Sequence, residues 1–90
     1  MKKRISILGA TGSIGCNALN VIENLEDDTT VVYLSCFSNS KKLIEQAKRF
    51  KPNAICLVEK ESYNEAKEEF KNEKIEVLFG REGLIELASR

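Results

Sequence analysis

A glycine-rich segment near the start of the chain has the residue types and spacing of a phosphate-binding loop. It connects a strand-like stretch to a helix-like one and reads Gly9-Ala10-Thr11-Gly12-Ser13-Ile14-Gly15. A bound pyrophosphate requires backbone amides that point towards it, no Cβ atom in its way and the positive end of a helix behind it. Gly9 would allow the sharp turn out of the strand, Gly12 the approach of the phosphates and Gly15 the close packing of the helix. Thr11 and Ser13 would add hydroxyl donors, so the segment predicts a dinucleotide-binding loop.

The surroundings of this loop support the interpretation. Glycine-rich turns between a strand and a helix also occur without a ligand, and a glycine pattern alone is weak evidence. Here a strand precedes the loop, a helix follows it, and further alternating units come after. No Gly-Lys-Ser/Thr sequence follows the glycines, which excludes the phosphate-binding loop of the P-loop nucleoside triphosphatases.

The end of the second strand bears on which dinucleotide is bound. An acidic residue about 20 positions after the glycines, at the end of that strand, holds the ribose 2′-hydroxyl in NAD-binding proteins. Asp27 and Asp28 have nearly that spacing but precede the second strand, at the wrong end of the sheet. The strand instead ends without a carboxylate, in Cys36-Phe37-Ser38-Asn39-Ser40-Lys41-Lys42. Hydroxyl, amide and lysine donors favour a 2′-phosphate, so Ser38 and Asn39 are predicted to contact NADP. Residues 38–40 also suit a helix cap, and capping is compatible with phosphate binding.

No catalytic residue and no metal ligand is predicted in this chain. It has no histidine, and its three cysteines are widely spaced, which argues against a zinc site or a disulfide framework. Buried reduced thiols are expected for Cys16, Cys36 and Cys56. Cys16 also lies in the first turn of a helix, where a reactive thiol is an alternative to a packing role. The charged residues of 59–74 are typical of a solvated helix face.

Strand-like and helix-like segments alternate along the whole chain. Strands are expected at 4–8, 30–37, 54–58 and 75–79. Helices are expected at 13–25, around Leu43 to Phe50 and ended by Pro52, at 61–71, and briefly at 84–88. A polar turn is expected at 26–29. This order predicts an α/β fold with a doubly wound, Rossmann-like parallel sheet and helices on both faces. Such sheets are usually larger than four strands, so residues 1–90 are expected to be the amino-terminal part of an NADP-binding domain, without the catalytic and carboxy-terminal domains.

Composition narrows the function classes. The chain has 42% hydrophobic and 31% charged residues, which is ordinary for a folded domain rather than a disordered one. Fourteen basic and fourteen acidic residues cancel, so no basic surface for nucleic acid or an anionic membrane is expected. The basic start at residues 2–4 is followed by an apolar run that breaks at Gly9, too early for a signal peptide. A cytoplasmic protein without nucleic-acid or membrane partners is predicted.

Taken together, the loop and several later stretches resemble the amino terminus of the 1-deoxy-D-xylulose 5-phosphate reductoisomerase family. The stretches are 8–15, 17–19, 39–46, 50–52 and 80–84. The resemblance covers the whole chain but only the beginning of the family's longer sequence. It implies that Thr11, Gly12, Ser13, Ile14 and Asn39 contact NADPH.

The family resemblance also implies a reaction. Members rearrange 1-deoxy-D-xylulose 5-phosphate and reduce it with NADPH to 2-C-methyl-D-erythritol 4-phosphate, in non-mevalonate isoprenoid biosynthesis. They use magnesium or manganese and are usually homodimers, and their metal ligands and phosphosugar contacts would lie beyond Arg90. This chain alone is therefore expected to be inactive. One departure concerns selectivity, because many members have Gly-Lys where this chain has Phe37-Ser38. Ser38, Asn39 or Lys41 would then have to compensate for the missing lysine.

Three other protein classes are compatible with the residues. Semialdehyde-dehydrogenase-like enzymes carry similar Gly-Ala-Thr-Gly loops and would need a catalytic cysteine and histidine downstream. Extended short-chain reductases typically place an acid or an arginine after the second strand, unlike Ser38-Asn39. A non-catalytic dinucleotide-binding module is the third alternative.

Overall fold

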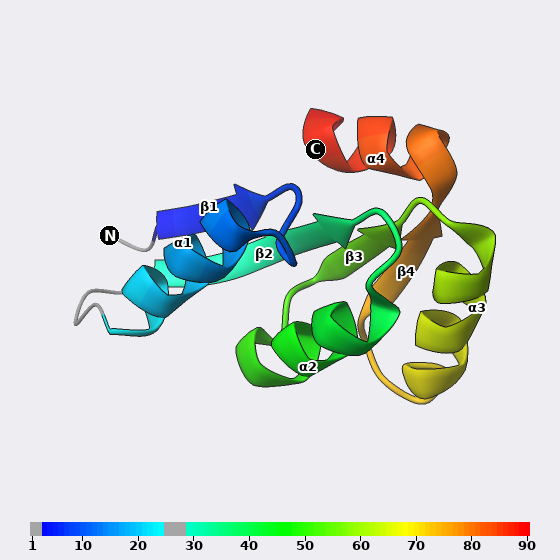
Figure 1. Cartoon of the computed structure of the whole chain (residues 1–90), viewed down its shortest axis with the longest axis horizontal. Coiled ribbons are helices and arrows are strands. Elements are labelled where there is room, and N and C mark those ends of the chain that lie inside the picture. The colour runs from blue at the N-terminus through cyan, green and yellow to red at the C-terminus, as the bar shows by residue number, and fades with distance from the viewer. Residues whose placement is uncertain (1–2, 25–28) are drawn as a thin grey trace.

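The structure is a computed structural model that describes residues 3–24 and 29–90. Within them, strands and helices alternate strictly (Figure 1). The strands are β1 (Lys3–Ile7), β2 (Thr29–Cys36), β3 (Ala54–Leu57) and β4 (Glu76–Phe79). The helices are α1 (Ser13–Glu23), α2 (Ser40–Phe50), α3 (Lys60–Glu69) and α4 (Gly80–Ser89). The predicted α/β class and the alternation are confirmed.

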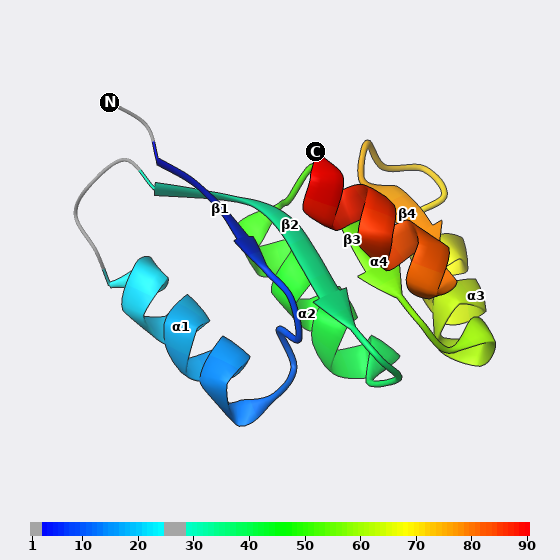
Figure 2. The same ribbon diagram turned by 90° about the horizontal axis from the view of Figure 1, so that it is seen from above.

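The sheet is parallel and its spatial order is β1-β2-β3-β4. Each strand therefore pairs with the next strand along the chain, through a helical crossover. Right-handed crossovers that all advance in one direction place their helices on one face. A single buried cluster contains Leu19 of α1, Leu43 of α2 and Phe70 at the end of α3. It lies under those three helices, whereas α4 covers the opposite face (Figures 1 and 2).

Strand β3 contributes side chains to a hydrophobic cluster on each face of the sheet. All four of its residues are fully buried, and they alternate between the faces. Ile55 and Leu57 belong to the cluster under α1, α2 and α3, while Ala54 and Cys56 belong to a second cluster with Leu87 of α4. Alternation follows from the period of two along a strand. An apolar run of this kind is typical of a parallel strand covered on both sides.

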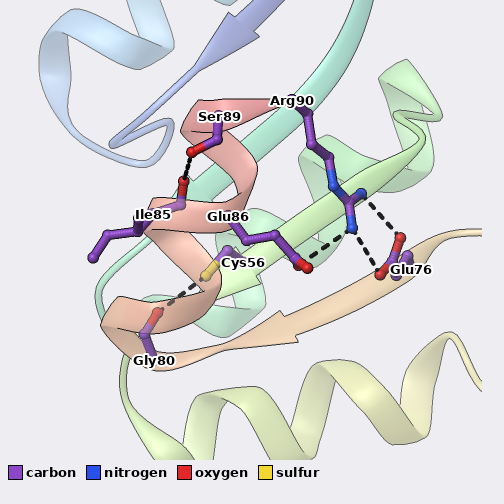
Figure 3. A network of polar contacts seen from close by, with 7 residues as sticks. All are labelled: Cys56, Glu76, Gly80, Ile85, Glu86, Ser89 and Arg90. Carbon is purple, nitrogen blue, oxygen red and sulfur yellow. Dashed lines mark hydrogen bonds and ion pairs between the residues drawn. The ribbon is translucent and has the colours of Figure 1, made fainter.

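Helix α4 is fixed to the sheet by packing and by an ion-pair network (Figure 3). Arg90 donates two hydrogen bonds of 3.0 Å to the carboxylate of Glu76 and one of 3.3 Å to Glu86. The Arg90 guanidinium lowers the pKa of Glu76 through these bonds. At the other end of the helix, the Cys56 thiol lies 3.5 Å from the carbonyl oxygen of Gly80. The helix is thus held at both ends over β3 and β4.

Several element boundaries differ from the predicted ones. Strand β2 ends at Cys36, so Phe37 lies outside it. Helix α4 begins at Gly80, directly after β4, and is longer than the predicted 84–88 because its first turn contains no apolar periodicity to signal it. Ile14 and Val21 share the helical spacing of the apolar residues of α1, which predicts them on its packed face, but their side chains are exposed. The prediction was wrong there because only Ala18, Leu19 and Ile22 of this helix reach the core.

Two predicted features lie outside the described residues. The polar turn at 26–29 falls largely on residues 25–28, and so do Asp27, Asp28 and the last residue of the predicted first helix. Among the described residues, no helix has the length and apolar character needed to span a membrane.

Candidate nucleotide-binding site

The loop after β1 has a sharply turned backbone that β2 holds in place. Gly9 has φ +76°, a left-handed conformation that glycine adopts without steric cost. The Gly9 amide donates to Oγ of Ser35 at 3.2 Å, and the Ala10 amide donates to the carbonyl oxygen of Ser35 at 2.7 Å. Within the loop, the Gly12 amide donates to the carbonyl oxygen of Gly9 at 3.2 Å. The predicted turn at Gly9 is confirmed, and its anchor on β2 is Ser35.

Gly15 is required by close packing. A Cβ atom at this position would lie 2.4 Å from the carbonyl oxygen of Gly9 and 2.7 Å from Cα of Ala10. Both are backbone atoms, which cannot move aside as a flexible side chain can. The predicted close packing of the helix is confirmed, and the partner is the loop backbone at Gly9 and Ala10, which follows β1.

Gly12 differs from Gly15, because nothing in the fold requires it to be glycine. Its backbone is extended, with φ −77° and ψ 172°, which any residue adopts. The nearest atom to an added Cβ would be the Gly9 carbonyl oxygen, at an ordinary contact distance of 3.6 Å. A glycine with room for a side chain leaves the backbone open to close approach from outside.

The amino terminus of α1 begins at this exposed loop. Gly12 is the N-cap residue, and no side chain caps the helix there. The first backbone amides of a helix have no partner within it, and together with the helix dipole they favour an anion. Ser13 and Ile14 in this first turn are exposed, Ile14 with 85% of its surface. An open groove of about 480 Å³ runs along the loop and is lined by Leu8, Gly12, Ser13 and Ile14, among others.

The residues after β2 lie at the same edge of the sheet as the loop, since β1 and β2 are parallel neighbours (Figure 2). Asn39 caps α2 by accepting a hydrogen bond from the Lys42 amide at 3.3 Å, which confirms the predicted capping. Ser38 is exposed, and its carbonyl oxygen accepts a bond of 2.6 Å from Oγ of Ser62 in α3. Ser40 is buried and donates to Glu65 at 2.7 Å, so its hydroxyl already serves the fold. Ser38 and Asn39 are therefore exposed to solvent, whereas Ser40 is buried and bonded to Glu65.

Two residues that support the loop were not predicted as site residues. Ser35, which follows the run Val31 to Leu34 in β2, binds the loop through its side chain and its backbone. Gln46 of α2 is buried, and its Nε2 donates to the carbonyl oxygen of Ala10 at 2.9 Å. The available signal was a polar residue on an apolar face, since Gln46 lies one turn after Leu43 and beside Ala47.

The cysteines have two kinds of environment. Cys36 and Cys56 are buried as predicted, and burial raises the pKa of each thiol to about 11. Cys16 is partly exposed, so the expectation of a fully buried thiol was wrong there. The residue lies in the first turn of α1, next to the exposed loop, and its Sγ is 3.6 Å from the carbonyl oxygens of Ala10 and Thr11. In the part of the chain that the structure describes, no group of three or more potential ligand side chains forms a metal site.

Known proteins match this chain over almost its full length. The family model of 1-deoxy-D-xylulose 5-phosphate reductoisomerase matches residues 5–90. The reductoisomerase of Chloroherpeton thalassium is 44% identical over 88 residues, which are 98% of this chain and 23% of the relative. That of Halothermothrix orenii is 37% identical over 89 residues, which are 99% of this chain and 23% of the relative. The chain thus spans about a quarter of the length of these relatives.

Solved structures of the same enzyme share the fold. The reductoisomerase of Zymomonas mobilis in complex with NADPH superimposes with a TM-score of 0.88 at 32% identity, covering 96% of this chain and 23% of that one. A reductoisomerase bound to NADPH, fosmidomycin and magnesium superimposes with a TM-score of 0.88 at 35% identity, covering 97% and 22%. The family model, the relatives and the solved structures each match nearly the whole chain, and this chain belongs to the 1-deoxy-D-xylulose 5-phosphate reductoisomerase family.

Proposed function

We propose that this chain forms the NADPH-binding part of a 1-deoxy-D-xylulose 5-phosphate reductoisomerase. The observation that carries the proposal is Gly12, whose extended backbone and free space mean that the fold does not need a glycine there. A pyrophosphate that approaches the backbone does need one. The similar reductoisomerase of Zymomonas mobilis was solved with NADPH bound, which supports the same role here.

The exposed groups suit the two phosphate regions of NADPH. Thr11 and Gly12 lead into the uncapped start of α1 at Ser13 and Ile14, where backbone amides and hydroxyls would hold the pyrophosphate. At the neighbouring strand end, Ser38 and Asn39 would contact the ribose 2′-phosphate. The exposed lysines 41 and 42 add positive charge in the first turn of α2. When bound, NADPH supplies a hydride to the reaction. This chain would hold and orient the NADPH.

The complete protein would add the rest of the enzyme. We infer that residues 1–90 are the amino-terminal part of its NADPH domain, and that catalytic and carboxy-terminal domains follow in the longer protein. Those domains would bind magnesium or manganese and the phosphosugar and would form a homodimer. The whole would convert 1-deoxy-D-xylulose 5-phosphate to 2-C-methyl-D-erythritol 4-phosphate for isoprenoid biosynthesis in the cytoplasm.

The proposal is tested by calorimetric titration of the 90-residue chain with NADPH and NADH, after circular dichroism has established folding. Binding of NADPH that is weakened about tenfold or more in Gly12→Ala, at unchanged stability, would support it. The substitution is informative because the free protein has room for the added methyl group. Equal affinity of Gly12→Ala and the unaltered chain would mean that NADPH does not approach the backbone at Gly12, and would overturn the assignment of the loop.

A chimera tests whether weak NADPH binding by the 90-residue chain means that it has no NADPH site or only part of one. Residues 1–90 replace the corresponding segment of the Chloroherpeton thalassium relative, with which they share 44% identity. NADPH-dependent turnover of 1-deoxy-D-xylulose 5-phosphate by the chimera supports the proposed function even if the short chain binds weakly. A folded chimera without NADPH binding contradicts it. The 90-residue chain alone is expected to consume no NADPH with this substrate.

A further inference from the structure

We propose that Gln46 is a positioning residue for the nucleotide loop, which it acts on through the Ala10–Thr11 peptide. The inference rests on the proposed binding of NADPH at this loop. Nε2 of Gln46 donates to the carbonyl oxygen of Ala10 across 36 positions of sequence, at 2.9 Å. Ala10 itself is fully buried, so this contact is shielded from water.

The rigidity of the peptide bond carries the effect to the exposed side of the loop. In a trans peptide, the carbonyl of one residue and the amide N–H of the next point in opposite directions. None of the described peptide bonds is cis. A carbonyl of Ala10 that is held towards Gln46 therefore turns the N–H of Thr11 away from the protein interior, towards the side where the phosphates would lie.

The preceding peptide is fixed in the complementary way. The Ala10 amide donates inward to the carbonyl oxygen of Ser35 at 2.7 Å, so the carbonyl of Gly9 faces the other way. That carbonyl accepts the Gly12 amide at 3.2 Å, which closes the turn. Ser35 and Gln46 thus fix two successive peptide planes, and only the second of them sets the direction of the Thr11 N–H.

Packing alone does not explain a glutamine at this position. Gln46 is only 9% exposed and belongs to the buried side of α2 with Leu43 and Ala47. Its Oε1 atom is buried and has no hydrogen-bond partner among the described residues. An unpartnered buried amide oxygen disfavours folding, and an apolar side chain of similar length would avoid it. The donor on Nε2 is what an apolar residue lacks. Its second contact is a weak one of 3.7 Å with Sγ of Cys16.

Three substitutions separate positioning from stabilisation. Gln46→Met keeps the length and removes the donor, while Gln46→Glu keeps the shape and donates only when its carboxyl group is protonated. Leu43→Ala is the matched control, because it weakens the packing of the same helix and removes no hydrogen bond to the loop. NADPH affinity is measured by calorimetry and stability by urea denaturation, on the 90-residue chain and in the chimera described above.

Gln46→Met is expected to weaken NADPH binding about tenfold, with a stability loss no larger than that of Leu43→Ala. Leu43→Ala should keep its affinity. Gln46→Glu should bind weakly above neutral pH and recover as the pH falls and its carboxyl group becomes protonated. The unaltered protein, titrated over the same range, corrects for the other charged or titratable groups of the surrounding groove, which are Cys16, Lys42, Glu45 and Arg49.

The outcomes also separate this inference from the proposed function. Affinity of Gln46→Met equal to that of the unaltered protein overturns the positioning role while NADPH binding stands. A loss of NADPH affinity in Leu43→Ala that equals the loss in Gln46→Met would also overturn the positioning role. If neither the 90-residue chain nor the chimera binds NADPH, the NMR resonance of the Thr11 amide still reports on the orientation of the Ala10–Thr11 peptide plane. A resonance that is unchanged between the unaltered chain and Gln46→Met, or between high and low pH in Gln46→Glu, contradicts the inference.

Discussion

Gly15 of α1 packs against the carbonyl oxygen of Gly9 so closely that an added Cβ atom would lie 2.4 Å from it. The contact joins the first turn of the helix to the loop that follows β1. It fixes where the helix amino terminus lies relative to the strand end, and hence where its free amides point. Gly12, three residues earlier, has no such constraint.

Gly15→Ala is expected to lower the free energy of unfolding by about 1–3 kcal/mol, because the new methyl group overlaps backbone that must shift. Gly12→Ala is the matched control and should change stability by less than about 0.5 kcal/mol. Urea denaturation followed by circular dichroism measures both. Equal stability of the two variants would contradict the packing assigned to Gly15.

The docking of α4 gives a second prediction. Leu87 is buried against Ala54 and Cys56, whereas Ile85 in the same helix is 67% exposed. Leu87→Ala should lower the free energy of unfolding by about 2–5 kcal/mol, through lost burial and the cavity it leaves. Ile85→Ala should change it by less than about 0.5 kcal/mol. A similar loss in both variants would mean that α4 does not pack on the sheet through Leu87.

The thiols should react at different rates and give the stability a pH dependence. In the native chain, a thiol reagent is expected to label the partly exposed Cys16 first, while Cys36 and Cys56 react only on unfolding. Cys16→Ser should remove the fast phase. Burial raises the pKa of Cys36 and Cys56 to about 11, above the unfolded value of about 8.5.

The sign of the pH effect follows from these pKa values. Above pH 8.5 the unfolded thiols release protons that the folded ones keep, so the free energy of unfolding falls as the pH rises from about 9 to 11. Stability measured across this range should therefore decline, and Cys56→Ala should make the decline shallower. A profile that is the same in the variant would contradict the assigned shift at Cys56.

Phe37 and Ser38 provide a test of cofactor selectivity. Both are exposed directly after β2, and neither side chain carries a positive charge. The double substitution Phe37→Gly and Ser38→Lys should tighten NADPH binding about tenfold relative to NADH, because the new ammonium group pairs with the 2′-phosphate. The bond from Ser62 goes to the backbone of Ser38 and is kept. Equal changes in both affinities would place the 2′-phosphate elsewhere.

Most of the fold was predictable from sequence because its signals are local. The run Ala54 to Leu57 has the apolar character of a strand covered on both faces, and Pro52 marks the limit of α2. The glycine loop was also predictable, since its residue types follow from steric requirements at Gly9 and Gly15. Local signals failed at Ile14 and Val21, where helical spacing does not reveal which side of α1 meets the sheet.

By itself, the sequence determined the order of the elements, the glycine loop between β1 and α1, and the capping of α2 by Asn39. The tertiary structure decided that Ser40 is withdrawn to Glu65 while Ser38 stays exposed, and that Ser35 and Gln46 hold the loop. Those contacts join residues 25 to 36 positions apart. A hydrogen bond between such distant residues depends on how the helices and strands pack together, and no local pattern of residue types records that packing.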